Sequence, residues 1–213
     1  MAYAMYAVKE IFKTLQGEGA QAGRAAVFCR FSGCNLWSGR EVDRAAATCR
    51  FCDTDFVGTD GPGGGQFATA TDLAAAIEAA WGAEPDRRFV VFTGGEPLLQ
   101  LDAEAIAAVR VRGFESAVET NGTKDLPPGL DWVCVSPKAG ASLRLRGGDE
   151  VKLVFPQHGI DPAEVAELEF RHFWIQPMDG AEREANTAAA VRYCLEHPRW
   201  RLSLQTHKFI GIP

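Results

Sequence analysis

The sequence lacks three features that would define broad classes of protein. No apolar run approaches the ~20 residues of a membrane span, and the apolar N-terminal stretch reaches Lys9 and Glu10 before a signal-peptide core can form. There is no excess of positive charge, since 22 basic against 28 acidic residues leave a net charge of −6. That sign opposes binding to phosphates. We therefore expect a soluble, cytoplasmic protein that binds neither a membrane nor nucleic acid directly.

The length and the pattern of apolar runs predict an α/β fold. A chain of 213 residues with 46% hydrophobic content suits one core, so we expect a single catalytic domain over residues 1–213. Short β-branched and aromatic runs predict strands at 26–31, 88–93, 115–120, 131–136, 150–155, 172–177 and 201–206. Capped helical patterns occupy 71–81, 102–112, a segment beginning at Asp161, and 182–196. Alternating strands and helices favour a parallel sheet.

Two connections lack the helix that a parallel crossover normally contains. Residues 121–130 and 137–148 hold proline, glycine and charge instead. This pattern predicts an incomplete, open (βα) barrel of about six parallel strands, with some crossover helices replaced by loops. In such folds the active site lies at the carboxyl ends of the strands. The glycine-rich segment 58–66 is expected to be a mobile loop.

Three of the six cysteines are close together in the sequence and predict one metal site. Cys34, Cys49 and Cys52 have the spacing C-x14-C-x2-C, and a reducing compartment disfavours disulfides. A structural zinc site normally has four protein ligands, and residues 34–52 contain neither a histidine nor a fourth cysteine. An iron–sulfur cluster with three protein ligands would leave one iron open for a ligand. Zinc and unrelated buried thiols remain as alternatives.

The remaining cysteines fit a different interpretation. Cys29, Cys134 and Cys194 fall within strand or helix patterns, where cysteine commonly serves as a small buried hydrophobe.

Seven motifs in order along the chain resemble one family. They are KTLQGEG, FCRFSGCN, CDTDF, GGEPLLQ, ETNGT, SPK and the terminal QTHK. Together they resemble the 7-carboxy-7-deazaguanine synthase family of the radical S-adenosylmethionine superfamily. The usual superfamily pattern is C-x3-C-x2-C, and this sequence departs from it by eleven additional residues between the first two cysteines. Members of this family include such an expanded spacing.

The resemblance implies a specific enzymatic reaction. In this reaction 6-carboxy-5,6,7,8-tetrahydropterin is converted to 7-carboxy-7-deazaguanine with loss of ammonia, an early step toward queuosine and other 7-deazapurines. The implied cofactors are a [4Fe–4S] cluster in a loop at about 32–56, S-adenosylmethionine and Mg²⁺. No catalytic side chain is implied, because the radical forms on the cofactor. The implied partners are an electron donor such as flavodoxin and a second copy of the chain. An activating enzyme for a glycyl-radical partner and a non-catalytic zinc module are alternatives.

The resemblance also assigns residues to each ligand. Those matched to S-adenosylmethionine are Phe51, Cys52, Asp53, Gly94, Gly95, Glu119, Asn121, Ser136, Pro137, Lys138, Gln176, Pro177, Met178 and Asp179. Thr54 matches a position that binds Mg²⁺ through its hydroxyl, and magnesium prefers such oxygen ligands. Those matched to the substrate are Leu15, Gln16, Gly17, Glu18, Arg30, Thr93, His207 and Pro213.

Each assignment has a simpler alternative. Phe51 could be a core aromatic, the double glycine and the ETNG segment could be turns, and Asp53 with Thr54 could cap a turn. Arg30 suits bidentate binding of a carboxylate but could be a surface arginine at a strand end. We expect the apolar tail after His207 to dock, so that the carboxylate of Pro213 reaches the substrate pocket.

Overall fold

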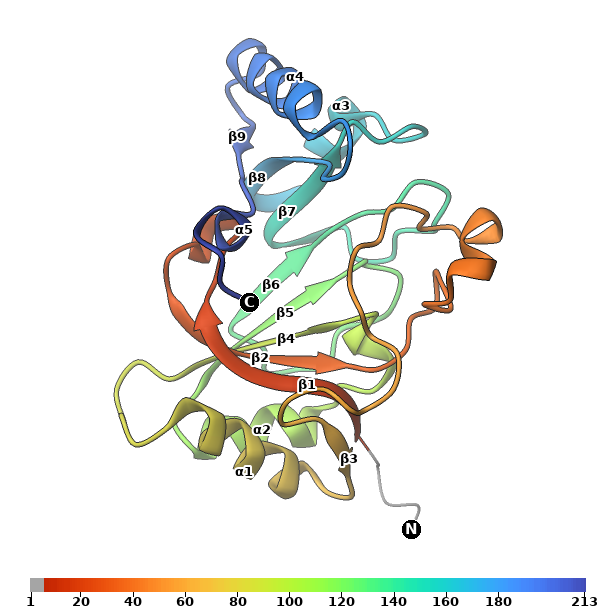
Figure 1. Cartoon of the computed structure of the whole chain (residues 1–213). Helices are drawn as coiled ribbons and strands as arrows, with labels where there is room; N and C mark the ends of the chain where they lie inside the picture. The colour runs from red at the N-terminus through yellow and green to blue at the C-terminus, as the bar shows by residue number, and fades with distance from the viewer. Residues whose placement is uncertain (1–5) are drawn as a thin grey trace.

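The computed structural model describes residues 6–213, and its centre is one nine-stranded sheet (Figure 1). The strand order is β3-β1-β2-β4-β5-β6-β7-β8-β9. The bounds are β1 Tyr6–Leu15, β2 Ala25–Phe31, β3 Gly65–Phe67, β4 Phe89–Gly94, β5 Glu115–Thr120, β6 Trp132–Val135, β7 Gly147–Phe155, β8 Glu169–Pro177 and β9 Arg201–Leu202. From β2 to β9 every described pair of neighbours is parallel, which confirms the predicted open α/β sheet.

Helices α1 to α4 lie where the sequence predicts them, and α5 was not predicted. Their bounds are α1 Ala70–Trp81, α2 Ala103–Val111, α3 Pro162–Ala166, α4 Arg183–Glu196 and α5 Thr206–Ile210, and 3-10 turns span Gly19–Gln21, Glu41–Ala46 and Pro97–Leu99. Thr69 and Asp102 cap α1 and α2 by accepting hydrogen bonds from backbone N–H groups of the first turn. No α-helix lies between β5 and β6 or between β6 and β7 in the described chain. Loops therefore replace the crossovers on that side, as predicted.

Both ends of the sheet differ from the prediction. Strand β1 was not expected, because Lys9, Glu10 and Lys13 interrupt its apolar alternation. In the structure its register with β2 shifts between Val8 and Glu10. The predicted strand at 201–206 is only two residues long as β9, and the chain enters α5 at Thr206.

The glycine-rich segment 58–66 was expected to be mobile, yet it lies against β1. Gly61 donates to the Lys9 carbonyl at 2.9 Å, and Ile11 donates to the Pro62 carbonyl at 2.8 Å. A Cβ on Gly64 would lie 2.1 Å from the Lys9 carbonyl oxygen, so only glycine permits this approach.

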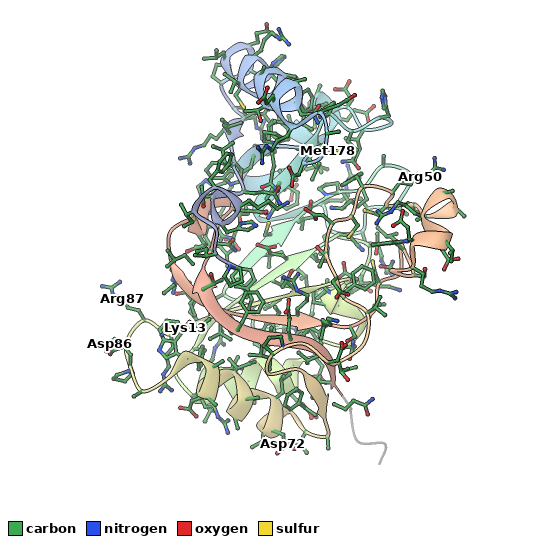
Figure 2. All side chains as sticks on the ribbon, in the orientation of Figure 1. Lys13, Arg50, Asp72, Asp86, Arg87 and Met178 are labelled. Carbon is green, nitrogen blue, oxygen red and sulfur yellow. The ribbon has the colours of Figure 1, made fainter. Side chains whose placement is uncertain are left out.

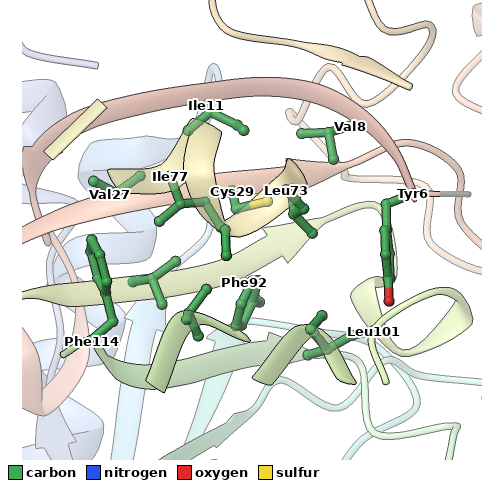
Figure 3. Packing of buried hydrophobic residues seen from close by; sticks show 14 of the residues in the cluster. Tyr6, Val8, Ile11, Val27, Cys29, Leu73, Ile77, Phe92, Leu101 and Phe114 are labelled. Carbon is green, nitrogen blue, oxygen red and sulfur yellow. The ribbon is translucent and has the colours of Figure 1, made fainter. Parts of the chain in front are cut away.

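Two apolar clusters pack helices against the sheet. Helices α1 and α2 pack on β1, β2, β4 and β5 through residues that include Ile11, Val27, Cys29 and Phe92 (Figure 3). A second cluster joins β7 and β8 to α3 and α4. Cys29 and Cys134 are fully buried, as predicted for small hydrophobes, whereas Cys194 on α4 is only partly buried. In Figure 2, Asp72 and Lys13 lie on the α1 side, away from Met178 and Arg50. No described helix is both long enough and apolar enough to cross a membrane.

Candidate active site

A cavity of about 510 Å³ lies at the carboxyl ends of the parallel strands. This volume is typical of a site for a small molecule or cofactor. The walls come from β1, from the ends of β2, β4, β5, β7 and β8, from the loop at 32–56, and from the C-terminal segment. Of the residues assigned above, those that line it are Leu15, Gln16, Gly17, Glu18, Arg30, Cys34, Cys49, Phe51, Cys52, Asp53, Thr54, Thr93, Gly94, Gly95, Glu119, Asn121, Ser136, Lys138, Gln176, Pro177, Met178, Asp179, His207 and Pro213.

Pro137 is the assigned residue that does not line the cavity. Its carbonyl accepts a hydrogen bond from Gln157 Nε2 at 3.4 Å, and Gln157 Oε1 accepts one from the Ala139 N–H. Pro137 therefore fixes the loop that carries Ser136 and Lys138, and its ring is not part of the wall.

The long segment between Cys34 and Cys49 is folded. Trp37 is buried and packs edge-on against Phe56 at 5.6 Å, and the Arg44 guanidinium lies 4.1 Å from the Trp37 ring centre. Arg44 also donates to the carbonyls of Arg50 and Cys52 at 2.8 and 3.0 Å. The eleven additional residues thus supply a side chain that holds the Cys49–Cys52 turn in place.

The three cysteines assigned to the cluster share one wall of the cavity. A hydrogen bond from Cys49 lowers the pKa of the Cys52 thiol to about 6, because Cys49 stabilises the Cys52 thiolate. Among residues 6–213, no three Cys, His, Asp or Glu side chains converge on a single ion position. In a cubane cluster the thiolates bind different irons of a larger group. The placement of three thiols along one cavity wall fits such a cluster.

The two glycines after β4 are required by the protein backbone itself. Gly94 has φ +133°, and a Cβ there would lie 2.2 Å from the Phe31 carbonyl oxygen. A Cβ on Gly95 would lie 2.2 Å from the Gly33 carbonyl oxygen and 2.8 Å from Cys34 Cβ. These glycines let β4 approach the loop that carries Cys34, which is more than the simple turn considered from the sequence.

Glu96 joins that loop to the end of β5 and was not among the predicted site residues. Its side chain is completely buried and accepts hydrogen bonds from Thr120 Oγ1 at 2.7 Å, from the Asn121 N–H at 2.8 Å and from the Leu98 N–H at 3.0 Å. Burial raises the pKa of this carboxyl group. Glu96 thereby fixes Asn121 at the cavity wall.

The side of the cavity near the cysteines carries two lysines and two carboxylates. Lys138 donates to the Ser136 carbonyl and hydroxyl at 2.7 and 2.8 Å, and burial lowers its pKa. Lys208 on α5 donates to Asp53 at 2.6 Å and to Asp179 at 2.7 Å. The C-terminal helix is thus tied to both the cysteine loop and the end of β8.

Another part of the cavity wall combines a paired arginine with hydrogen-bonding groups. Arg30 Nε donates to Glu10 Oε1 at 2.7 Å, which leaves the two terminal nitrogens of the guanidinium available. His207 lies against Gly17, where a Cβ would be 2.1 Å from His207 Nδ1. Thr206 donates to the Gly17 carbonyl through both its N–H and its hydroxyl.

Several site residues were missed by the sequence interpretation. Glu10 lies on the unpredicted β1, and Gln205 and Lys208 belong to the QTHK motif, in which only His207 was assigned a role. Lys152 had a recognisable signal, since it is a charge flanked by apolar residues within the predicted buried strand 150–155.

Known proteins are similar to this chain over nearly its full length. A family model described as the radical SAM superfamily matches residues 43–147, beginning after Cys34. The 7-carboxy-7-deazaguanine synthases of Bordetella pertussis and Burkholderia multivorans are 67% and 59% identical, each over 208 residues that cover 98% of this chain and 99% of the relative. The crystal structure of QueE from Escherichia coli superposes with a TM-score of 0.71 at 27% identity, covering 94% of this chain and 93% of that one.

These relatives match nearly the full length of the chain, and the fold agrees with that of the solved structure. The chain belongs to the 7-carboxy-7-deazaguanine synthase family of the radical SAM superfamily.

Proposed function

We propose that this chain converts 6-carboxy-5,6,7,8-tetrahydropterin to 7-carboxy-7-deazaguanine with release of ammonia, in the biosynthesis of queuosine and related 7-deazapurines. The observation that carries the proposal is one cavity lined both by three thiols and by Arg30, Gln16 and Glu18. Residues 1–213 act as one catalytic domain in this proposal. A redox centre and a polar substrate would then meet within the same cavity.

Cys34, Cys49 and Cys52 would hold the [4Fe–4S] cluster, and the adjoining wall would hold S-adenosylmethionine. When bound, these two cofactors supply the radical that starts the ring contraction. Phe51 offers an apolar face, and the Lys138 ammonium lies 6.0 Å from its ring centre. Residues proposed to orient the rest of the cofactor are Gly94, Gly95, Asn121, Ser136, Gln176, Pro177, Met178 and Asp179.

Arg30 would bind the substrate carboxylate. Its pairing with Glu10 through Nε orients the guanidinium, so the terminal nitrogens can donate two parallel hydrogen bonds. The residues proposed for the remaining edges of the pterin are Leu15, Gln16, Gly17, Glu18, Thr93, His207 and Pro213.

Mg²⁺ would bind the hydroxyl of Thr54, with substrate oxygens and water completing its coordination. Thr54 lines the cavity two residues from Cys52, so its hydroxyl is available to such an ion within the same site. A flavodoxin would supply the electron, and the reducing cytoplasm would protect the cluster. The active protein would be a homodimer.

The proposal is tested with anaerobically purified and reconstituted protein. With S-adenosylmethionine, reductant and the pterin, we expect the ultraviolet spectrum of the deazaguanine product, and chelation of Mg²⁺ should lower the rate. Cleavage of S-adenosylmethionine without product would favour an activating enzyme for a glycyl-radical partner. A colourless protein that contains zinc without iron would favour a non-catalytic module.

The role of Arg30 can be tested by Arg30→Lys. Lysine keeps the positive charge but cannot form the two parallel bonds, so KM for the pterin should rise about 10- to 100-fold. Arg24→Lys is the matched control, because Arg24 pairs with Glu115 and does not line the cavity. Steady-state kinetics of both variants provide the measurement. An unchanged KM for Arg30→Lys would remove Arg30 from the carboxylate site.

A further inference from the structure

A buried lysine on β7 is charged and lies between two glutamates at the cavity wall. The Lys152 side chain is 5% exposed. Its Nζ contacts Glu18 Oε2 and lies 3.6 Å from Glu119 Oε1. A buried ammonium is unfavourable unless it is paired, so this placement requires both partners.

The lysine links segments that are distant in the sequence. Glu18 also accepts from Gln205 Nε2 at 2.9 Å, and Glu119 Oε1 also accepts from Gln16 Nε2 at 2.9 Å. Lys152 therefore joins β7 to the LQGEG segment, to the end of β5 and to the C-terminal segment. All five of these side chains line the cavity.

Two carboxylates share the Lys152 ammonium. The other groups that act on these side chains include His207, whose charge lowers the pKa of Glu18, and Lys138, whose charge repels Lys152. Among the described residues, protein donors reach only one oxygen of Glu119, so its second oxygen can accept a hydrogen bond from a ligand. A surface of this kind suits a ligand edge rich in N–H donors, such as the amine side of a pterin.

We propose that Lys152 is a positioning residue that orients Glu18 and Glu119 as acceptors for the N–H donors of the substrate. This inference rests on the proposed function, since it names the group that prepares the substrate side of that same site. Lys152 acts through the two carboxylates and needs no contact with the substrate.

The electrostatics of Glu18 agree with this role. Burial alone would raise the pKa of Glu18, but the Lys152 ammonium and the hydrogen bonds from Lys152 and Gln205 lower it to about 2. Glu18 is then ionised at every pH at which the protein is assayed. Without the ammonium, burial and the neighbouring Glu119 would both raise that pKa, and binding would weaken as the pH falls.

The test is Lys152→Met, which removes the charge while keeping the length of the side chain. We expect KM for the pterin to rise about 10- to 100-fold. We also expect kcat/KM to decline toward acidic pH between about 8 and 5, where the wild-type profile lacks such a limb. Lys152→Arg should restore the flat profile, because it supplies a cation to the same carboxylates. Lys13→Met is the matched control, since Lys13 donates to the Trp81 carbonyl on the helical side (Figure 2).

Reductive cleavage of S-adenosylmethionine provides a second readout that does not require the pterin reaction. If Lys152→Met cleaves the cofactor at the wild-type rate, the residues that bind the cluster and the cofactor are intact. The raised KM then reflects weaker binding of the pterin. Wild-type KM and a flat pH profile in this variant would overturn the inference. Failure of the wild-type protein to form product would instead contradict the proposed function.

If Lys152→Met does not fold, the double variant Lys152→Met/Glu119→Gln is used for the test. Removing one carboxylate relieves the repulsion that the missing lysine leaves. We expect this double variant to fold and to keep the raised KM, and a wild-type KM would again overturn the inference.

Discussion

Replacing Cys34 by alanine is expected to eliminate the iron–sulfur absorption of the protein and to lower its activity at least about a thousandfold, or roughly 4 kcal/mol of activation free energy. Cys34 supplies one of three thiols at the cavity wall, and two thiolates cannot hold the same cluster. The apo fold should survive, because Cys34 is only partly buried, in a loop outside the sheet. Iron analysis and the product assay measure the two effects.

Cys194→Ala is the control for this prediction. Cys194 lies on α4, is also partly buried, and does not line the cavity. The Cys194→Ala variant should keep its iron and its activity. Full iron content and normal turnover in the Cys34 variant would show that Cys34 is not a cluster ligand.

Replacing Gly95 by alanine is expected to destabilise the protein and to impair the cluster site together. The added Cβ would lie 2.2 Å from the Gly33 carbonyl oxygen and 2.8 Å from Cys34 Cβ, and backbone atoms cannot move aside cheaply. We expect a loss of about 3 kcal/mol in the free energy of unfolding, at the upper end of overpacking effects. In a chain of this size that loss lowers Tm by about 6–12 °C. Thermal unfolding and iron content are the measurements.

Gly65→Ala makes the same chemical change where space exists. Its added Cβ would meet only the Phe67 ring, at 3.9 Å, and should leave both Tm and iron content close to those of the wild type. If Gly95→Ala behaved in the same way, the contact between β4 and the Cys34 loop would be less tight than described.

The fold could be predicted where local signals act alone. The run Val90–Phe92 is buried on both faces of the sheet, so its continuous hydrophobicity marked β4 correctly. The caps Thr69 and Asp102 marked two helix starts, because a capping side chain acts within one turn. Strand β1 was not predicted, because Glu10 faces the cavity and Lys13 faces Trp81, so neither fits an apolar alternation.

The site residues also divide into those with a local signal in the sequence and those without one. Residues within ordered motifs were found from the sequence, and their side chains line one cavity. The groups that hold them were not found, because their partners are far away along the chain. Lys152 and Glu18 are 134 residues apart, and Lys208 and Asp53 are 155 apart. Such a pair can be recognised only after the sheet has brought its strands together.

The glycine-rich segment beside β1 has a consequence for how the protein behaves at high concentration. Strand β1 is next to the edge of the sheet, and β3 pairs with only its first three residues. Backbone groups of Lys9 and Ile11 beyond that point would be open to a strand from another molecule, a common route to aggregation. Gly61 and Pro62 bond to those groups instead. A segment with no part in the chemistry thus protects the colloidal stability of the enzyme.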